Sequence, residues 1–144
     1  MDTDGVTRVF ATDKRDKKPV EMCTNAILLN QDCKRLTKSL SSGPYILLAH
    51  AIELLLKAYL HKQGESLDDL RKSYGHDLVE LLKDARGRGL TVSDPEADNF
   101  IYRLNTALEK AALRYEFYFS DLPMVDRLAK FSETLAKDVK QTLE

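Results

Sequence analysis

The segment RKSYGHDL, residues 71–78, carries an arginine and a histidine that suit acid–base chemistry on a phosphate ester. Histidine moves protons near neutral pH, and the arginine fork binds phosphate oxygens. On one continuous helix, five steps of about 100° would turn Arg71 and His76 about 140° apart. Gly75 interrupts the helix, and a turn there would bring the two side chains together as a catalytic pair. The alternative is that the segment only ends one helix and begins another, with Asp77 as N-cap; the residues alone favour this alternative.

A second set of polar residues lies on the apolar stretch of residues 44–62. His50, Glu53, Lys57 and His61 follow in steps of three, four and four, so they share one helix face. An exposed Glu53–Lys57 pair would be an ordinary surface ion pair. A buried one would line a cleft or a subunit interface, because unpaired charges are not left in a core. We predict that Glu53 and Lys57 bind a ligand.

The segment RYEFYF, residues 114–119, joins an arginine to a cluster of aromatic rings. Arg114 could hold a phosphate while a ring such as Tyr115 stacks on a base. The same residues also suit a structural carboxylate pair and aromatic core packing. Both interpretations stay open, and Arg114 and Tyr115 are predicted ligand-binding residues.

The sequence predicts neither a metal site nor a cofactor. A di-iron helical bundle needs paired Glu-x-x-His motifs on two helices, whereas HAIE, residues 50–53, is the reverse and has no counterpart. Cys23 and Cys33 stand about 15 Å apart along one expected helix, beyond disulfide reach. They are expected to be core thiols in a reducing compartment.

The apolar spacing predicts the helices that position these residues. The first is expected from Pro19 to about residue 40 and the second over about 44–62. A short turn over 67–73, capped by Ser66, precedes a third helix over roughly 77–86. The fourth is expected to begin at a Ser93–Glu96 capping box and the fifth at Val125. No strand-like alternation appears. The predicted fold is all-α, an up-and-down antiparallel bundle of four long helices plus a short helical insert. Residues 19–144 are expected to form one domain, and residues 1–18 a flexible charged arm.

Charge and hydropathy limit the classes of partner. The 22 basic and 23 acidic residues nearly cancel, so any phosphate binding must come from local clustering. The N-terminal residues lack the apolar core of a secretory signal, and the longest apolar run contains His50, Glu53 and Lys57. We therefore expect a cytoplasmic protein without a membrane span.

The chain resembles the HEPN domain (higher eukaryote and prokaryote nucleotide-binding) in three segments that occur in the family's order. They are AHAIELLLKAYLHKQG, YGHDLVELLKDA and LRYEF, and together they span roughly residues 20–140. The resemblance implies an antiparallel helical bundle, often a homodimer. The HEPN family includes nucleotide-binding domains, protein partners of small nucleotidyltransferases in toxin–antitoxin pairs, and ribonuclease toxins.

The ribonuclease branch carries Arg, four to six residues, then His, and four residues separate Arg71 from His76. The resemblance implies that His76 would take the proton of a ribose 2′-hydroxyl while Arg71 stabilises the transition state without metal. In that branch the motif usually sits on a late helix with a polar residue such as Asn after the Arg, whereas Lys72 follows here. Nonenzymatic members also carry HDL at this place.

Three functions remain open at this point. The leading one is a homodimeric binding module for a nucleotide, an RNA phosphate or a partner protein, without turnover. The second is a metal-independent, toxin-like endoribonuclease that uses Arg71 and His76. The third is a structural helical adaptor whose polar stripe is a dimer seam.

Overall fold

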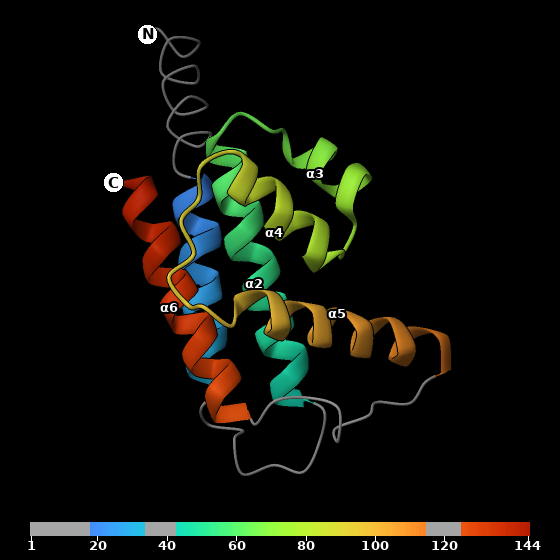
Figure 1. Ribbon diagram of the computed structural model, residues 1–144. Helices are drawn as coiled ribbons and strands as arrows, with labels where there is room; N and C mark the ends of the chain where they lie inside the picture. The colour runs from blue at the N-terminus through green and yellow to red at the C-terminus, as the bar shows by residue number, and fades with distance from the viewer. Residues whose placement is uncertain (1–17, 34–42, 115–124) are drawn as a thin grey trace, which may run out of the picture.

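The computed structural model describes residues 18–33, 43–114 and 125–144, with side chains for all of them except residues 110–114. All regular secondary structure in this part of the chain is α-helix, which confirms the all-α class. A helix covers residues 18–33, and it is followed by α2 (Gly43–Lys62), α3 (Leu67–Tyr74), α4 (Leu78–Gly87), α5 (Ala97–Arg114) and α6 (Val125–Leu143) (Figure 1). The predicted arm lies almost wholly outside the described residues.

The central element is α2, which contacts α3, α4, α5 and α6. Its apolar residues surround the helix, and this pattern is typical of a helix buried in the core. Its largest fully buried side chains are Leu48, Ile52, Leu55, Leu56 and Leu60. Among the described helices, α2 alone is long and apolar enough to cross a membrane. However, 67% of its most apolar 18-residue stretch is buried inside the fold. This burial is what a core helix shows.

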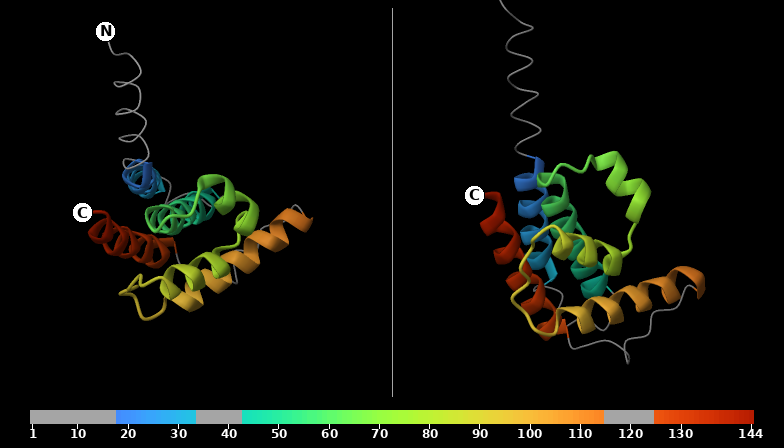
Figure 2. Two further views of the ribbon diagram at one scale, coloured as in Figure 1. Left: turned by 90° about the horizontal axis from the view of Figure 1, so that it is seen from above. Right: turned by 45° about the horizontal axis from the view of Figure 1, so that its top comes forward.

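Three long helices, residues 18–33, α2 and α6, run side by side, while α5 passes across α2 and extends away from the other two (Figures 1 and 2). The Ser132 hydroxyl on α6 donates a hydrogen bond to the buried Asn30 side chain at 2.7 Å. The Cys33 thiol donates to the Pro44 carbonyl at 3.5 Å, which joins the first helix to α2. The up-and-down order of four long helices is not confirmed, because α5 does not run along the other three.

Both cysteines lie in the core as free thiols, as the sequence predicted. Burial raises the pKa of the Cys23 thiol, and the nearby Lys140 opposes that shift. Burial also raises the pKa of the Cys33 thiol, and the charge of Asp126 adds to it. Because the thiolate is the reactive form, both thiols are poor nucleophiles in the folded chain.

The caps around RKSYGHDL follow the prediction of a helix boundary. The Ser66 side chain accepts a hydrogen bond from the Asp69 N–H at 3.0 Å and so caps α3. That helix ends at Gly75, whose φ of 55° is a conformation that glycine adopts without a steric penalty. The Asp77 carboxylate caps α4 by accepting from Val79 and Glu80 at 3.1 and 3.2 Å. Local sequence chemistry therefore fixes both ends of the α3–α4 connection.

The predicted Ser93–Glu96 capping box is wrong. α5 begins at Ala97, and the Asp94 carboxylate, not the Ser93 hydroxyl, accepts from the Glu96 N–H at 2.9 Å. Ser93 instead donates to Asp138 on α6 at 2.6 Å. Arg127, also on α6, binds Asp94 at 3.2 Å and holds that carboxylate in place. These contacts come from residues far away in the sequence, which is why local spacing could not predict them.

Candidate functional site

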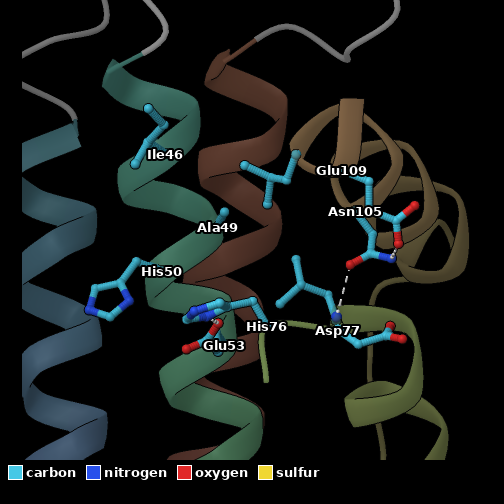
Figure 3. A pocket seen from close by; sticks show the side chains of 10 residues that line it. Ile46, Ala49, His50, Glu53, His76, Asp77, Asn105 and Glu109 are labelled. Carbon is cyan, nitrogen blue, oxygen red and sulfur yellow. Dashed lines mark hydrogen bonds and ion pairs between the residues drawn. The ribbon is translucent and has the colours of Figure 1, made fainter. Parts of the chain in front are cut away.

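An open cavity of about 520 Å³ lies between α2, the α3–α4 connection and α5 (Figure 3). Its apolar lining comes from Ile46, Ala49, Leu78 and Leu108, and its polar lining from His50, Glu53, His76, Asp77, Asn105 and Glu109. A mostly apolar cavity with a few convergent polar groups is the usual form of a small-molecule site. The cavity therefore collects Glu53 and His76 from the predicted residues and adds others from α5.

Glu53 is the buried charge of this cavity, with only 8% of its surface exposed. One carboxylate oxygen lies 2.6 Å from His76 Nδ1, and the other lies 3.4 Å from Lys57 Nζ one turn along α2. Lys57 also donates to the Gly75 carbonyl at 2.7 Å. A charge at such a position needs partners, because desolvation without compensation is costly. Glu53 and Lys57 thus tie α2 to the α3–α4 connection, and the exposed-pair interpretation does not apply.

His76 presents an oriented imidazole at the edge of the cavity. Its side chain is 88% exposed, although Nδ1 contacts the Glu53 carboxylate (Figure 3). When Nδ1 carries the proton and donates to Glu53, Nε2 is left as a free acceptor. A carboxylate that fixes an imidazole in this way is the arrangement of many general bases. The ring is placed to exchange a proton with a bound group.

Arg71 lies on α3 and has a separate set of partners. Its side chain is 76% exposed, and its guanidinium contacts Asp68 at 2.7 Å, while Lys72 binds the same carboxylate at 2.9 Å. Within the described part of the chain, no hydrogen bond or ion pair joins Arg71 to His76. The structure brings His76 to Glu53 instead, and the catalytic pairing of Arg71 with His76 stays a prediction.

The α3–α4 connection, residues 75–77, carries His76 and is anchored where it leaves α3. At the end of α3, the Tyr74 hydroxyl donates to the Asp84 carboxylate on α4. This hydrogen bond and partial burial raise the pKa of Tyr74 to about 12. Because the phenol must keep its proton to donate, Tyr74 can hold this hydrogen bond from neutral pH up to that value.

Two residues of α5 were missed by the sequence analysis. Asn105 is 9% exposed, and its amide oxygen accepts from the Leu78 N–H at 3.0 Å, a donor that the first turn of α4 leaves free. Its amide nitrogen donates to Glu109 at 3.4 Å. The available signal was a polar Asn within an apolar helical stripe, followed four residues later by Glu. The contact between Asn105 and Leu78, and the cavity itself, form only when α5 packs against α2 and α4, so the sequence alone could not reveal them.

The remaining predicted residues are not among the described lining of the cavity. His61 lies at the end of α2 with Nδ1 2.6 Å from the Glu65 carbonyl, a local turn contact outside the cavity. Arg114 is the last residue of α5, but its side chain and all of Tyr115 lie outside the described part of the chain. Their ligand-binding roles stay predictions.

The charges of the cavity lining are carboxylates and histidines. Glu53, Asp77 and Glu109 are the acidic lining residues, and none of the lining residues that the structure describes is a lysine or an arginine. A phosphate would therefore meet negative charge without a permanent cation in this cavity. In the described residues, no group of three or more His, Cys, Asp or Glu side chains is placed to hold a metal ion.

No protein-family model, curated protein or solved structure matches the chain. The HEPN resemblance therefore rests on the three sequence segments alone.

Proposed function

We propose that this chain is a HEPN-like cytoplasmic binding module without turnover, and that the cavity between α2 and α5 holds a nucleotide by its base. The observation that carries the proposal is the lining of that cavity, in which fixed polar groups interrupt apolar walls. The groups are fixed because Glu53, His76 and Asn105 each have a hydrogen-bond partner on another element. Such a preorganised site loses little entropy when a ligand binds.

The chemistry of the lining favours a planar polar ring over a phosphate. Asn105 and Glu109 offer an amide and a carboxylate on α5, and His76 offers a ring nitrogen from the α3–α4 connection. These groups can pair with the edge of a base, while Ile46 and Leu108 contact its faces. The phosphate would extend away from these carboxylates into solvent, because none of the lining residues within the described part of the chain is a lysine or an arginine. The resemblance to nucleotide-binding domains supports the same ligand class.

Calorimetric titration with the four common ribonucleosides and their 5′-monophosphates tests this proposal. We expect one nucleoside to bind, and its monophosphate to bind no more tightly. Glu109→Gln should weaken binding of that nucleoside about tenfold, because it removes a charge-assisted hydrogen bond. Glu80→Gln is the control, because Glu80 is exposed on α4 and does not line the cavity. No heat with any of these compounds, together with unchanged RNA mobility, would remove the nucleotide and leave docking of a partner protein.

A metal-independent endoribonuclease is the second candidate, and the His76–Glu53 contact is the observation that favours it. His76 Nε2 would take the 2′-hydroxyl proton, and the 2′-oxygen would attack phosphorus as the P–O5′ bond breaks. The 5′-oxygen would leave with a proton from the imidazolium or water, and the other product would end in a 2′,3′-cyclic phosphate. Arg71 would leave its surface pair with Asp68 to stabilise the phosphorane, because exposed ion pairs are weak. RNA cleavage that persists in EDTA and is lost in both His76→Ala and Arg71→Ala supports this activity. Cleavage that His76→Ala leaves intact excludes it.

The assembly belongs to the same proposal. The resemblance supports a homodimer, and it also supports docking on a nucleotidyltransferase-type protein partner. Light scattering during size-exclusion chromatography measures the mass of the particle at micromolar concentration, where a stable dimer gives twice the 16.4 kDa of the chain. A strict monomer would exclude the homodimer and the structural adaptor with a dimer seam, and it would leave the cavity within one chain unaffected.

A further inference from the structure

A second cavity, of about 440 Å³, lies between α4 and α5 and is not used by the proposed function. Apolar side chains of both helices line it, namely Val79, Leu82 and Ile101. Leu82 and Ile101 belong to the hydrophobic core and are 3% and 1% exposed, so this part of the lining is rigid. Leu82 and Ile101 therefore form a fixed floor under the cavity, and the half-buried Val79 is the apolar lining residue that a flat ring can cover.

Tyr102 stands beside this apolar surface with 65% of its surface exposed, the highest value among the large hydrophobic residues described. Its hydroxyl makes no hydrogen bond among the described residues. An aromatic ring in this position contributes little to the core, and its face is open to a second ring. Stacking on such rings is the usual way in which proteins bind unpaired bases.

Two cations stand at the same cavity. Lys83 is exposed and has no ion-pair partner in the part of the chain that the structure describes. Arg86 binds Asp98, whose side chain is 74% exposed. The three charges leave the cavity with one net positive charge, in contrast to the carboxylates of the first cavity. Arg86 retains donors for a second anion, because a guanidinium has five N–H groups.

We propose that the α4–α5 cavity binds a nucleobase that carries a phosphate. The base stacks on Tyr102 above the apolar residues, and Lys83 and Arg86 contact the phosphate. The ligand comes either from a free nucleotide or from single-stranded RNA, which share this chemistry. The site is separate from the first cavity, because the two cavities share none of the lining residues that the structure describes.

Fluorescence anisotropy of the full chain with a labelled single-stranded RNA of twelve nucleotides tests this site. We expect Tyr102→Ala to weaken binding about tenfold and Tyr102→Phe to stay within about twofold of the wild type, because stacking needs the ring and not the hydroxyl. Lys83→Ala should lower the slope of log affinity against log salt by about one. Lys130→Ala, an exposed lysine on α6, is the matched control and should change nothing.

The proposal is overturned if the RNA and AMP both fail to bind, if Tyr102→Ala binds like the wild type, or if Tyr102→Phe loses as much affinity as Tyr102→Ala. Competition with unlabelled AMP separates the two sources. Full competition assigns the site to a free nucleotide, and absence of competition from AMP while the RNA still depends on Tyr102 assigns it to the single strand. The first cavity is tested by nucleosides without a phosphate and by Glu109→Gln, and this site by the RNA and Tyr102→Ala, so the two proposals fail separately.

Discussion

At the scale of single residues, Glu53 decides how the candidate site is built. It is a buried carboxylate with His76 on one oxygen and Lys57 on the other, and these contacts join a core helix to a surface connection. The sequence predicted that Glu53 and Lys57 share a helix face. It could not predict the contact with His76, because the two residues are 23 positions apart and meet only after α3 has folded back. The pairing of Arg71 with Asp68 follows from ordinary i,i+3 spacing.

We expect Glu53→Gln to lower the free energy of unfolding by about 2 kcal/mol, because the substitution leaves the half-buried Lys57 without its counter-charge. Urea denaturation monitored by circular dichroism measures this change. Asp68→Asn is the control: it removes a carboxylate from an exposed pair and should cost less than about 1 kcal/mol. Equal losses in the two variants would contradict the structural role of Glu53.

Tyr74 makes stability depend on pH at the alkaline end. Its folded-state pKa is raised from about 10 to about 12, so its contribution is complete below pH 10 and is lost as the pH rises through 12. We expect the stability advantage of the wild type over Tyr74→Phe to be constant from pH 7 to 10 and to fall between pH 10 and 12. Denaturant midpoints measured across this range give the difference. A difference that does not vary with pH would contradict the Tyr74–Asp84 hydrogen bond.

At the scale of elements, the sequence predicts helices well and their arrangement poorly. The expected helix over 44–62 is α2 at Gly43–Lys62, and the one over 77–86 is α4 at Leu78–Gly87, because apolar periodicity and caps are local signals. The crossing of α5 depends on contacts such as Asn105 with Leu78, 27 residues apart, and the start of α5 depends on Arg127. No local pattern contains such information.

Gly75 sets the turn that delivers His76 to Glu53, and it has a positive φ of 55°. A Cβ at this position meets no atom within 4 Å, so Gly75→Ala adds backbone strain without a clash. We expect it to cost about 1 kcal/mol. Gly87→Ala is the matched control, because Gly87 is helical, also has open space, and should be neutral or stabilised by up to about 1 kcal/mol. Thermal unfolding of both variants measures the contrast, and equal midpoints would contradict this role of Gly75.

At the scale of the whole molecule, the described helices share one hydrophobic core around α2, and both cysteines belong to it. We expect Cys23 and Cys33 to react with a thiol reagent at pH 8 far more slowly in the folded chain than in urea, because burial raises the pKa of both thiols. Time courses with Ellman's reagent measure both rates. Rapid modification of two thiols per folded chain would contradict the packing of the first helix against α2 and α6.

We propose above that the cavity between α2 and α5 binds a base, and a nucleoside titration of the full chain followed by ¹H–¹⁵N NMR tests this most directly. We expect one of the four ribonucleosides to shift the Asn105 side-chain amide and the backbone amides of Ala49 and Leu108 together and to saturation, because these residues line one cavity. Nucleosides that leave all three signals unchanged, or that move only signals on the other face of α5 near Tyr102, would contradict it.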